Sequence, residues 1–258
     1  MSELLPDDLP DNVRVTSVNE VMAVMSSGPL LTVCFDLDGC LVDTRAAFTE
    51  SLNEALHEHG LPTLPKSSLH RYIGPPLRGT LVELVDELLG DPDDVDAILA
   101  AYRRHYRHAS LRLTTRVPGI RSALNALDLW VRAGVVTSKP LPFAVPIIDA
   151  VGLRRQVAFV EGPSLEATEE TKTETLARAL DRWGRSDVAV VIGDRAEDIA
   201  AGHANEAVTV GVTWGIGDEE ELRDAGAASI VTDPAELPDL LRAIRAEAGG
   251  VGPGAPQR

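Results

Sequence analysis

Hydrophobic and polar positions along the chain follow two alternating patterns, each of which predicts a different element. Short apolar runs rich in strand formers predict buried strands, whereas apolar residues spaced three and four positions apart predict helices. The predicted strands are 30–36, 130–138, 156–162, 187–194, 207–213 and 228–233, the last of them a short edge strand. The predicted helices are 45–60, 80–90, 94–109, 118–127, 143–153, 172–184, 195–206 and 234–247.

The order of these elements predicts an α/β fold built in two parts. Strands that alternate with helices indicate a mostly parallel sheet covered by helices on both faces. Only helical patterns occur in 45–114, so we expect a helical domain inserted into a core formed by 13–44 and 115–246. Residues 1–12 and 247–258 have the composition of flexible segments and are predicted to be disordered tails.

Composition narrows the partners and the compartment. The chain has 24 basic and 40 acidic residues and a net charge of −16, which argues against nucleic acid as the main partner. No apolar run approaches the roughly 20 residues that span a membrane. The amino terminus lacks the basic start and apolar stretch of a signal peptide, so we expect a cytoplasmic protein without a membrane partner. The two cysteines, Cys34 and Cys40, are expected to be reduced and buried.

Carboxylates follow two of the predicted strands. Asp36 and Asp38 end the first apolar run, while Asp194 and Asp198 lie at the end of the run 187–194 and in the helix that follows. Residues two apart in an extended chain point the same way, and residues four apart on a helix share a face. Open α/β sheets bind ligands outside the carboxyl ends of their strands. We therefore expect these carboxylates to converge at that edge.

Three further polar residues are placed for the same edge. Thr137 and Ser138 end the second predicted strand, and Lys172 opens a helix, where backbone N–H groups also favour an anion. Carboxylates with one lysine form a site of hard oxygen ligands that suits Mg²⁺ and a phosphate. One aspartate could attack phosphorus while its neighbour transfers protons. Each feature alone is also explained by a turn, a helix cap or a solvated lysine, but their joint occurrence favours a site.

Four short motifs resemble those of the haloacid dehalogenase superfamily. "FDLDGCLVDT" (35–44) is similar to the first motif and "VVTSKP" (135–140) to the second; Lys172 and "VVIGDRAED" (190–198) match the third and fourth. The resemblance extends over about 32–242 and is to the phosphoglycolate-phosphatase-like branch of phosphatases with a helical cap. It implies a Rossmann-like core with a parallel sheet and an inserted α-helical cap of the C1 type.

The resemblance also implies a role for each matched residue. Asp36 would be the nucleophile, and Asp38 would be the general acid and base and would lend its backbone carbonyl to Mg²⁺. Thr137 would hydrogen-bond the phosphoryl group, and Lys172 would neutralise this group and orient Asp36. The implied metal site comprises Asp36, Asp38, Asp194 and Asp198.

The expected substrate is a small phosphorylated metabolite, with phosphoglycolate, nucleoside monophosphates and sugar phosphates as the candidates of this branch. Gly39 and Ser138 are predicted to contact it beside the aspartates. The stretch 74–78, "GPPLR", is the candidate substrate loop, in which Arg78 could pair with a second anion. Arg78 could equally be a surface residue of the following helix. No pattern in the chain indicates an oligomeric state or a role for residues 1–29.

Two other functions remain open. A sugar-phosphate mutase of the β-phosphoglucomutase type would have a similar cap, although that branch places a histidine where this chain has Phe48. A non-catalytic binding protein could share the fold, but every expected catalytic position is filled. Three further functions are disfavoured. A dehalogenase would lack Asp38, and a receiver domain would lack the helical insert. A phosphonate hydrolase would need a reactive lysine in the cap, where Lys66 is the only lysine.

Overall fold

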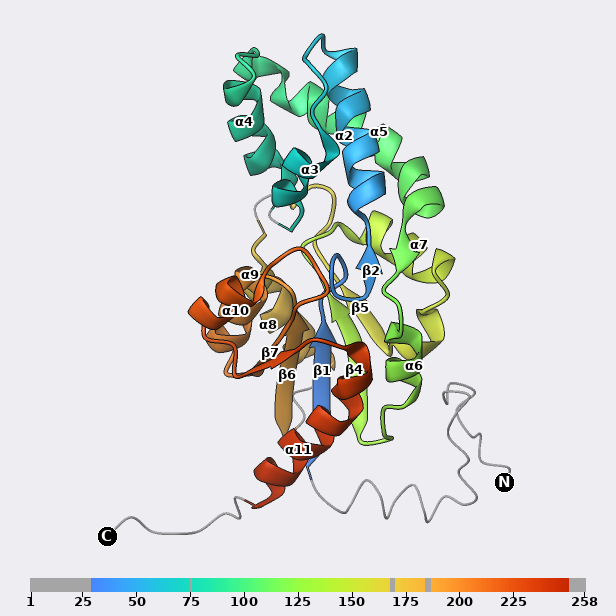
Figure 1. Ribbon diagram of the computed structural model, residues 1–258, viewed down its shortest axis with the longest axis vertical. Coiled ribbons are helices and arrows are strands. Elements are labelled where there is room, and N and C mark those ends of the chain that lie inside the picture. Colours follow the sequence, from blue (N-terminus) through green and yellow to red (C-terminus); the bar gives the residue numbers. More distant parts are fainter. Residues whose placement is uncertain (1–28, 75, 168–169, 184–186, 251–258) are drawn as a thin grey trace.

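Six parallel strands form the centre of the protein in a computed structural model. The structure describes residues 29–74, 76–167, 170–183 and 187–250. The strands are β1 (Leu31–Phe35), β4 (Val131–Val136), β5 (Phe159–Glu161), β6 (Val188–Gly193), β7 (Val208–Val212) and β8 (Ser229–Val231). Their order across the sheet is β5-β4-β1-β6-β7-β8, so β1 is central and β8 is an edge strand, as predicted. The parallel α/β core predicted from the sequence is confirmed (Figure 1).

The central strand β1 is buried on both faces because its side chains alternate between two apolar clusters. Val33 and Phe35 pack in the larger cluster, which also includes residues of helices α6 (Ile120–Asn125) and α11 (Leu237–Gly250). Cys34 points into the second cluster with residues of α8 (Lys172–Trp183) and α9 (Ala196–Ala204). Both cysteines are buried and free, as expected. This packing fixes the position of the strand end from which the first aspartates project.

A group of helices lies beyond the carboxyl ends of the strands (Figure 1). They are α2 (Arg45–Glu58), α3 (Lys66–Leu69), α4 (Leu77–Glu87) and α5 (Val95–Leu113), with the 3₁₀ helices η1 (His70–Tyr72) and η2 (Pro92–Asp94). The chain enters and leaves this group, which we call the cap, through the antiparallel pair β2 (Val42–Asp43) and β3 (Thr115–Arg116). The cap therefore connects to the core through two adjacent strands, close to the carboxylates.

The remaining elements complete the core and include several that were not predicted. Helix α7 (Leu141–Ala150) forms as predicted and contains Pro146. The short elements α10 (Glu219–Asp224) and η3 (Arg154–Gln156) and the β2–β3 pair were missed because they are too short to show a period. The 3₁₀ helix η4 (Pro234–Glu236) lies inside the predicted helix 234–247.

One predicted boundary is wrong. Helix α11 continues through 247–250, which we assigned to the disordered tail, because Ala246, Glu247 and Ala248 favour a helix. The predicted tail 1–12 and the rest of the carboxyl-terminal one, 251–258, lie outside the described residues.

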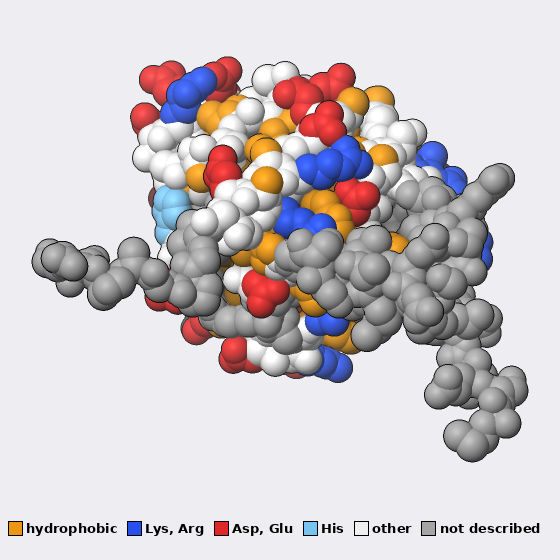
Figure 2. Space-filling view, turned by 90° about the horizontal axis from the view of Figure 1, so that it is seen from below, with side chains coloured by type: hydrophobic (Ala, Val, Ile, Leu, Met, Phe, Trp, Pro, Cys, Tyr) orange, Lys and Arg blue, Asp and Glu red, His pale blue; other side chains and the backbone are white. Residues whose placement is uncertain are grey.

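The described part of the chain contains no membrane-spanning helix, and its face opposite the cap carries charges of both signs. None of its helices has the length and hydrophobicity that crossing a bilayer requires. Figure 2 shows the face opposite the cap, where acidic and basic side chains are interspersed with uncharged ones on the coloured surface. The visible part of this face therefore offers no continuous basic patch of the kind that binds a phosphate backbone.

Candidate active site

Three buried carboxylates meet at the carboxyl ends of the two central strands. Asp36 follows β1, Asp194 follows β6, and Asp198 lies in the first turn of α9. One oxygen atom from each lies within 4.8 Å of one from the others. Their exposed fractions are 7%, 0% and 1%, respectively, so all three are nearly removed from water. We call these three residues the carboxylate cluster; the structure brings them together at the sheet edge where the sequence places them.

One ammonium group partly balances the charge of the carboxylate cluster. Lys172, the first residue of α8, contacts both Asp36 and Asp198 through its Nζ atom. Burial alone would lower the pKa of Lys172, but the adjacent carboxylates of Asp198 and Asp36 outweigh burial and raise it. Burial raises the pKa of Asp36 to about 7, against the opposing effect of Lys172. Among the described residues, Lys172 is the cation in direct contact with the group of three carboxylates, through Asp36 and Asp198, which leaves an excess of negative charge at the contact when all of them are ionised.

Asp194 is the least compensated member of the carboxylate cluster. Its Oδ2 atom accepts a hydrogen bond of 2.6 Å from the Ile216 amide, whereas its Oδ1 atom has no hydrogen-bond partner among the described residues. Burial raises its pKa well above the usual range, and the neighbouring charges of Asp198 and Asp36 add to this effect. A buried acceptor without a donor is costly. The donor set, oxygen atoms with excess negative charge, fits a hard divalent cation such as Mg²⁺.

Glycine is required at two positions that touch the carboxylate of Asp194. Gly39 has a φ of +90°, and a Cβ atom added there would lie 2.2 Å from the Asp194 Oδ2 atom. A Cβ atom at Gly215 would lie 2.2 Å from the same oxygen. The Gly39 amide donates to the Val42 carbonyl at 2.8 Å, so this amide is already engaged. The structure therefore explains the glycine at position 39 by close packing against the carboxylate, and the substrate contact of Gly39 stays a prediction.

Asp38 faces the cap and is held by two side chains. Its Oδ1 atom accepts a 2.6 Å hydrogen bond from the Thr44 hydroxyl, and its Oδ2 atom lies 2.8 Å from Lys139 Nζ. The Lys139 ammonium also donates to the Tyr106 hydroxyl at 2.8 Å, and Tyr106 belongs to cap helix α5. Burial would lower the pKa of Lys139, but Asp38 outweighs burial and raises it. Asp38 is thus linked through Lys139 to the cap, while Asp36 points to the other two members of the carboxylate cluster.

Thr137 and Ser138 lie where β4 turns toward α7. The Thr137 side chain is buried, and its Oγ1 atom accepts a 3.1 Å hydrogen bond from the Lys139 amide. This bond stabilises the turn that presents Lys139 to Asp38, so Thr137 has a structural role whatever else it binds. Ser138 lines the cavity beside Asp38, together with Lys139. Of the two, Ser138 therefore has the more direct access to a ligand in that cavity.

A narrow cavity of about 100 Å³ opens beside Asp38 between the cap and the core. The rings on its walls contact one another: Tyr102 lies 5.7 Å from Phe48 and 5.2 Å from Tyr106, centroid to centroid, and Tyr106 lies 5.6 Å from Phe143. Apolar walls next to a charged end suit the organic part of a phosphate ester. We call this space the inner cavity.

Arg78 lines the inner cavity, but it does not lie in a loop. It is in the first turn of helix α4, which begins at Leu77 and so includes the last part of the predicted loop 74–78. Its guanidinium group forms an ion pair with Asp96, with hydrogen bonds of 2.9 and 3.3 Å. Of the two alternatives left open by the sequence, the structure shows the second, a residue of the following helix, because α4 begins directly after Pro76. Position 75 lies outside the described residues.

Three groups near the site were not identified as site residues from the sequence, and a fourth, Lys139, was only a weaker candidate for substrate recognition. Thr44 is the last residue of the motif at 35–44, whereas Tyr106 and the Ile216 amide carry no motif. The contacts of all three with the aspartates or with Lys139 depend on tertiary packing. Lys139 had a signal, because it follows Thr137 and Ser138 directly at the sheet edge. Its contact with Asp38 makes it a more substantial part of the site than its sequence context alone suggested.

Comparisons with known proteins agree with this geometry. A family model described as haloacid dehalogenase-like hydrolase matches residues 33–212. Tyrosine-protein kinase PtkA of Mycobacterium tuberculosis is 31% identical over 217 residues, which cover 82% of this chain and 72% of that protein. A phosphoglycolate phosphatase of Rhodospirillum rubrum is 32% identical over 218 residues, covering 81% and 90% of the two chains. The structure of a "predicted phosphatase" from Clostridium acetobutylicum, 29% identical, matches with a TM-score of 0.76 over 83% of this chain and 99% of that one.

Proposed function

The chain belongs to the haloacid dehalogenase-like hydrolase family, and from this premise we propose that it is a Mg²⁺-dependent phosphomonoester hydrolase that forms an aspartyl-phosphate. The observation that carries the proposal is the carboxylate cluster, in which three buried carboxyl groups share one ammonium group and one Asp194 oxygen has no hydrogen-bond partner within the described ranges. The expected substrate is a small phosphorylated metabolite. Phosphoglycolate, nucleoside monophosphates and sugar phosphates are the first compounds to test.

Asp36 is the proposed nucleophile. Its carboxylate attacks phosphorus, the bond from phosphorus to the ester oxygen breaks, and an acyl phosphate forms on Asp36. Attack needs the ionised carboxylate, and the contact with Lys172 favours that form against the effect of burial. Lys172 also offers its positive charge to the phosphoryl oxygens, while its contact with Asp198 fixes its position.

Asp38 is the proposed general acid and base. It gives a proton to the leaving oxygen and then takes one from the water that hydrolyses the acyl phosphate. In the structure both of its oxygen atoms are engaged, by Thr44 and by Lys139. Asp38 must therefore release at least one of these partners during the cycle. Because Lys139 also bonds to Tyr106 of the cap, movement of the cap is a direct way to change the environment of Asp38.

Asp36, Asp194 and Asp198, with the backbone carbonyl of Asp38, are the residues that would hold Mg²⁺. Bound there, the ion would supply positive charge that offsets the carboxylates and the phosphoryl oxygens. The protein supplies the rest of the arrangement: Gly39 keeps the chain close to Asp194, and the Ile216 amide orients its carboxylate.

Two other activities compete with hydrolysis. A mutase would return the phosphoryl group to the sugar; Phe48, at the position of that branch's histidine, packs against Tyr102 and offers no proton-transferring group. A kinase activity would follow the relative named tyrosine-protein kinase PtkA, and it would consume ATP. Both differ from hydrolysis in the product, so one set of reactions separates all three.

The test is phosphate release from a panel of phosphomonoesters with Mg²⁺ by the wild type, Asp36→Asn and the control Asp149→Asn, which removes the same charge from an exposed position on α7. Parallel reactions measure the interconversion of sugar-phosphate isomers and the ATP-dependent phosphorylation of tyrosine peptides. The proposal predicts phosphate release by the wild type and the control, with a loss of several orders of magnitude in Asp36→Asn. Isomerisation or peptide phosphorylation without net phosphate release would replace the proposal with one of the two alternatives.

A further inference from the structure

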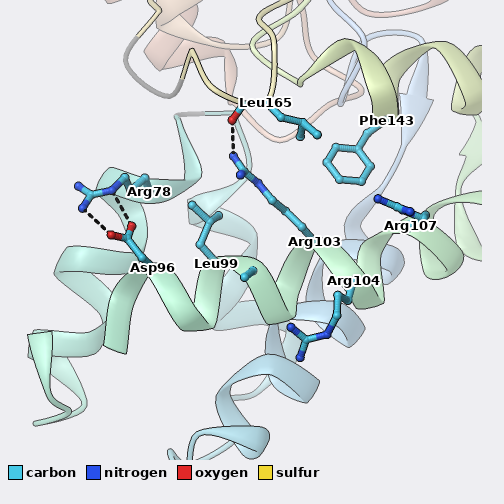
Figure 3. Close-up of a pocket in the computed structure, with 9 residues that line it drawn as sticks. Arg78, Asp96, Leu99, Arg103, Arg104, Arg107, Phe143 and Leu165 are labelled. Atoms are coloured by element: carbon cyan, nitrogen blue, oxygen red, sulfur yellow. Dashed lines mark hydrogen bonds and ion pairs between the residues drawn. The ribbon is translucent and has the colours of Figure 1, made fainter. Parts of the chain in front are cut away.

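A second and larger cavity adjoins the inner cavity. It has a volume of about 490 Å³ and lies between cap helix α5 and the core (Figure 3). The two cavities share the lining residues Arg78, Leu99, Arg103 and Phe143. We call this space the outer cavity. A ligand that begins at Asp38 and passes the aromatic walls of the inner cavity would therefore continue into it.

Four arginines line the outer cavity, although the chain has a net charge of −16. Two of them are paired with carboxylates. Arg78 forms an ion pair with Asp96 at 2.9 Å, and Arg104 forms one with Glu58 at 2.7 Å. In Figure 3 the Arg104 side chain points away from Arg103, to the other side of α5. These two arginines therefore add little unbalanced charge to the cavity.

The other two arginines, Arg103 and Arg107, lie one helical turn apart on α5. Together with Leu99 they follow a spacing of four, which places all three on one face of the helix. Arg103 donates a 3.1 Å hydrogen bond to the backbone carbonyl of Leu165, which satisfies a donor but leaves the charge in place. Arg107 forms no hydrogen bond or ion pair with any residue the structure describes, and in Figure 3 it lies beside Phe143.

One carboxylate, on the exposed residue Glu166, reduces the positive charge at Arg103. The pKa of Glu166 is lowered mainly by a hydrogen bond from Ser164, and the positive charge of Arg103 contributes to the shift. Arg107 has no such neighbour among the described residues. The wall of the outer cavity therefore carries an unbalanced positive charge centred on Arg107, next to the apolar surfaces of Leu99 and Phe143.

We propose that Arg103 and Arg107 form a subsite for a second anionic group on the substrate, separated from the scissile phosphate by an apolar or aromatic segment. This inference rests on the proposed phosphatase function and specifies its substrate class. The scissile phosphate lies at Asp36, the spacer occupies the inner cavity, and a carboxylate or second phosphate reaches the guanidinium groups in the outer cavity. Guanidinium groups are suited to such anions because they can bind both oxygens of a carboxylate or phosphate.

The sizes of the cavities argue for a substrate longer than phosphoglycolate. In phosphoglycolate a single carbon separates the ester oxygen from the carboxylate, so both charges would stay at the Asp38 end. The outer cavity would then remain without a ligand, although its volume of about 490 Å³ is the larger of the two. Sites for small organic molecules usually enclose about 300–1,000 Å³. The two cavities together fall in that range, whereas the inner one of about 100 Å³ does not.

The test compares phenyl phosphates whose para chain ends in a carboxylate, over a series of chain lengths, with the matching carboxamides. The proteins are the wild type, Arg107→Gln, Arg107→Lys and the control Arg104→Gln, whose side chain is paired with Glu58. For the best chain length we expect the wild type to prefer the acid to the amide by about tenfold in kcat/KM, the effect of one charge-assisted contact. Arg107→Gln should lose this preference, while Arg107→Lys and Arg104→Gln keep most of it. Unsubstituted phenyl phosphate, which has no second anion, gives the reference rate for each of the four proteins.

Two results would overturn the subsite, and they differ from a failure of the proposed function. If the wild type hydrolyses phenyl phosphate but treats every acid and amide alike, the subsite is wrong and the phosphatase stands. A preference for the acids that survives in Arg107→Gln would also refute it. If no compound is hydrolysed, the phosphatase proposal fails, and calorimetric binding of the same acids and amides decides the subsite. Equal affinities for acid and amide would then refute the subsite, and acid-selective binding lost in Arg107→Gln would support it.

Discussion

Removal of one charge from the carboxylate cluster should make the metal-free protein more stable. In the absence of a cation, Asp194 is fully buried beside Asp36 and Asp198, and its Oδ1 atom has no hydrogen-bond partner among the described residues. Asn has nearly the same shape as Asp but carries no charge. We therefore expect Asp194→Asn to raise the unfolding temperature while it abolishes the proposed activity. Such a trade between stability and function is common at active sites.

The magnitude follows from the separation of the carboxylates. At the limit of 4.8 Å, Coulomb's law with an effective dielectric constant of about 20 gives about 3 kcal/mol for each carboxylate pair. When all three carboxyl groups are ionised, Asp194→Asn removes two such repulsions and the attraction to Lys172, so about one repulsion is relieved. The weaker hydrogen bond from the Ile216 amide to a neutral acceptor returns about 1 kcal/mol. The expected net gain is about 2 kcal/mol, or roughly 4–8 °C for a domain of this size.

The assay is thermal unfolding followed by circular dichroism at pH 8 with EDTA or with Mg²⁺. With EDTA, Asp194→Asn should unfold at a higher temperature than the wild type, and the exposed control Asp149→Asn should not. With Mg²⁺ at 100 times its dissociation constant, the wild type should gain about 2.7 kcal/mol and the mutant much less. A mutant that unfolds at or below the wild-type temperature in EDTA would refute the argument that the cluster is electrostatically strained.

Three further outcomes follow from the same site. In EDTA, the free energy of unfolding should fall as pH rises from 3.8 to about 7, because Asp36 holds its proton more tightly in the folded protein than in the unfolded chain. The upper limit of this fall is about 4 kcal/mol. Urea unfolding at a series of pH values should show a flatter pH dependence for Asp36→Asn than for the wild type. Lys172→Met leaves the carboxylates without the ammonium group that contacts them. It should lower kcat at least about 100-fold and destabilise the metal-free protein by about 3 kcal/mol at pH 8. A near-normal kcat would exclude the role proposed for Lys172. Gly39→Ala places a Cβ atom 2.2 Å from the Asp194 Oδ2 atom, so Mg²⁺ should no longer raise the unfolding temperature of this variant. A normal increase with Mg²⁺ would show that the loop at residue 39 can move away from Asp194.

The residues of the core site could be predicted because each one lies at a defined end of a regular element. A buried strand is visible as an apolar run, and its carboxyl end in a parallel sheet is also the ligand-binding edge. Asp36 and Asp194 follow two strands that are direct neighbours in the sheet, so local sequence was enough to bring them together. Lys172 could be placed near them because it opens a helix. Its simultaneous contact with Asp36 and Asp198 could not be foreseen from spacing, since it depends on how α8 packs against the sheet.

The cap residues could not be predicted in the same way, because their functional neighbours are distant in the sequence and follow no motif. The segment 74–78 resembled a loop, yet Arg78 lies on a helix and pairs with Asp96 of α5. Arg103 and Arg107 look like ordinary exposed residues of an amphipathic helix until the fold places Phe143 opposite them. The helical period predicts that they share a face, but not that the face borders a cavity.

Lys139 shows why the two halves of the site must be considered together. It belongs to the core by sequence and lies beside Thr137, yet its ammonium group bridges Asp38 and the hydroxyl of Tyr106 on cap helix α5. The same helix carries Arg107 one residue further along, toward the outer cavity. A ligand that occupies the outer cavity therefore contacts the helix that also holds Lys139 against Asp38. Arg107 of the proposed anion subsite and Tyr106, which holds Lys139 against the proposed proton donor Asp38, thus share helix α5, so we expect binding in the outer cavity to favour the geometry needed at Asp38.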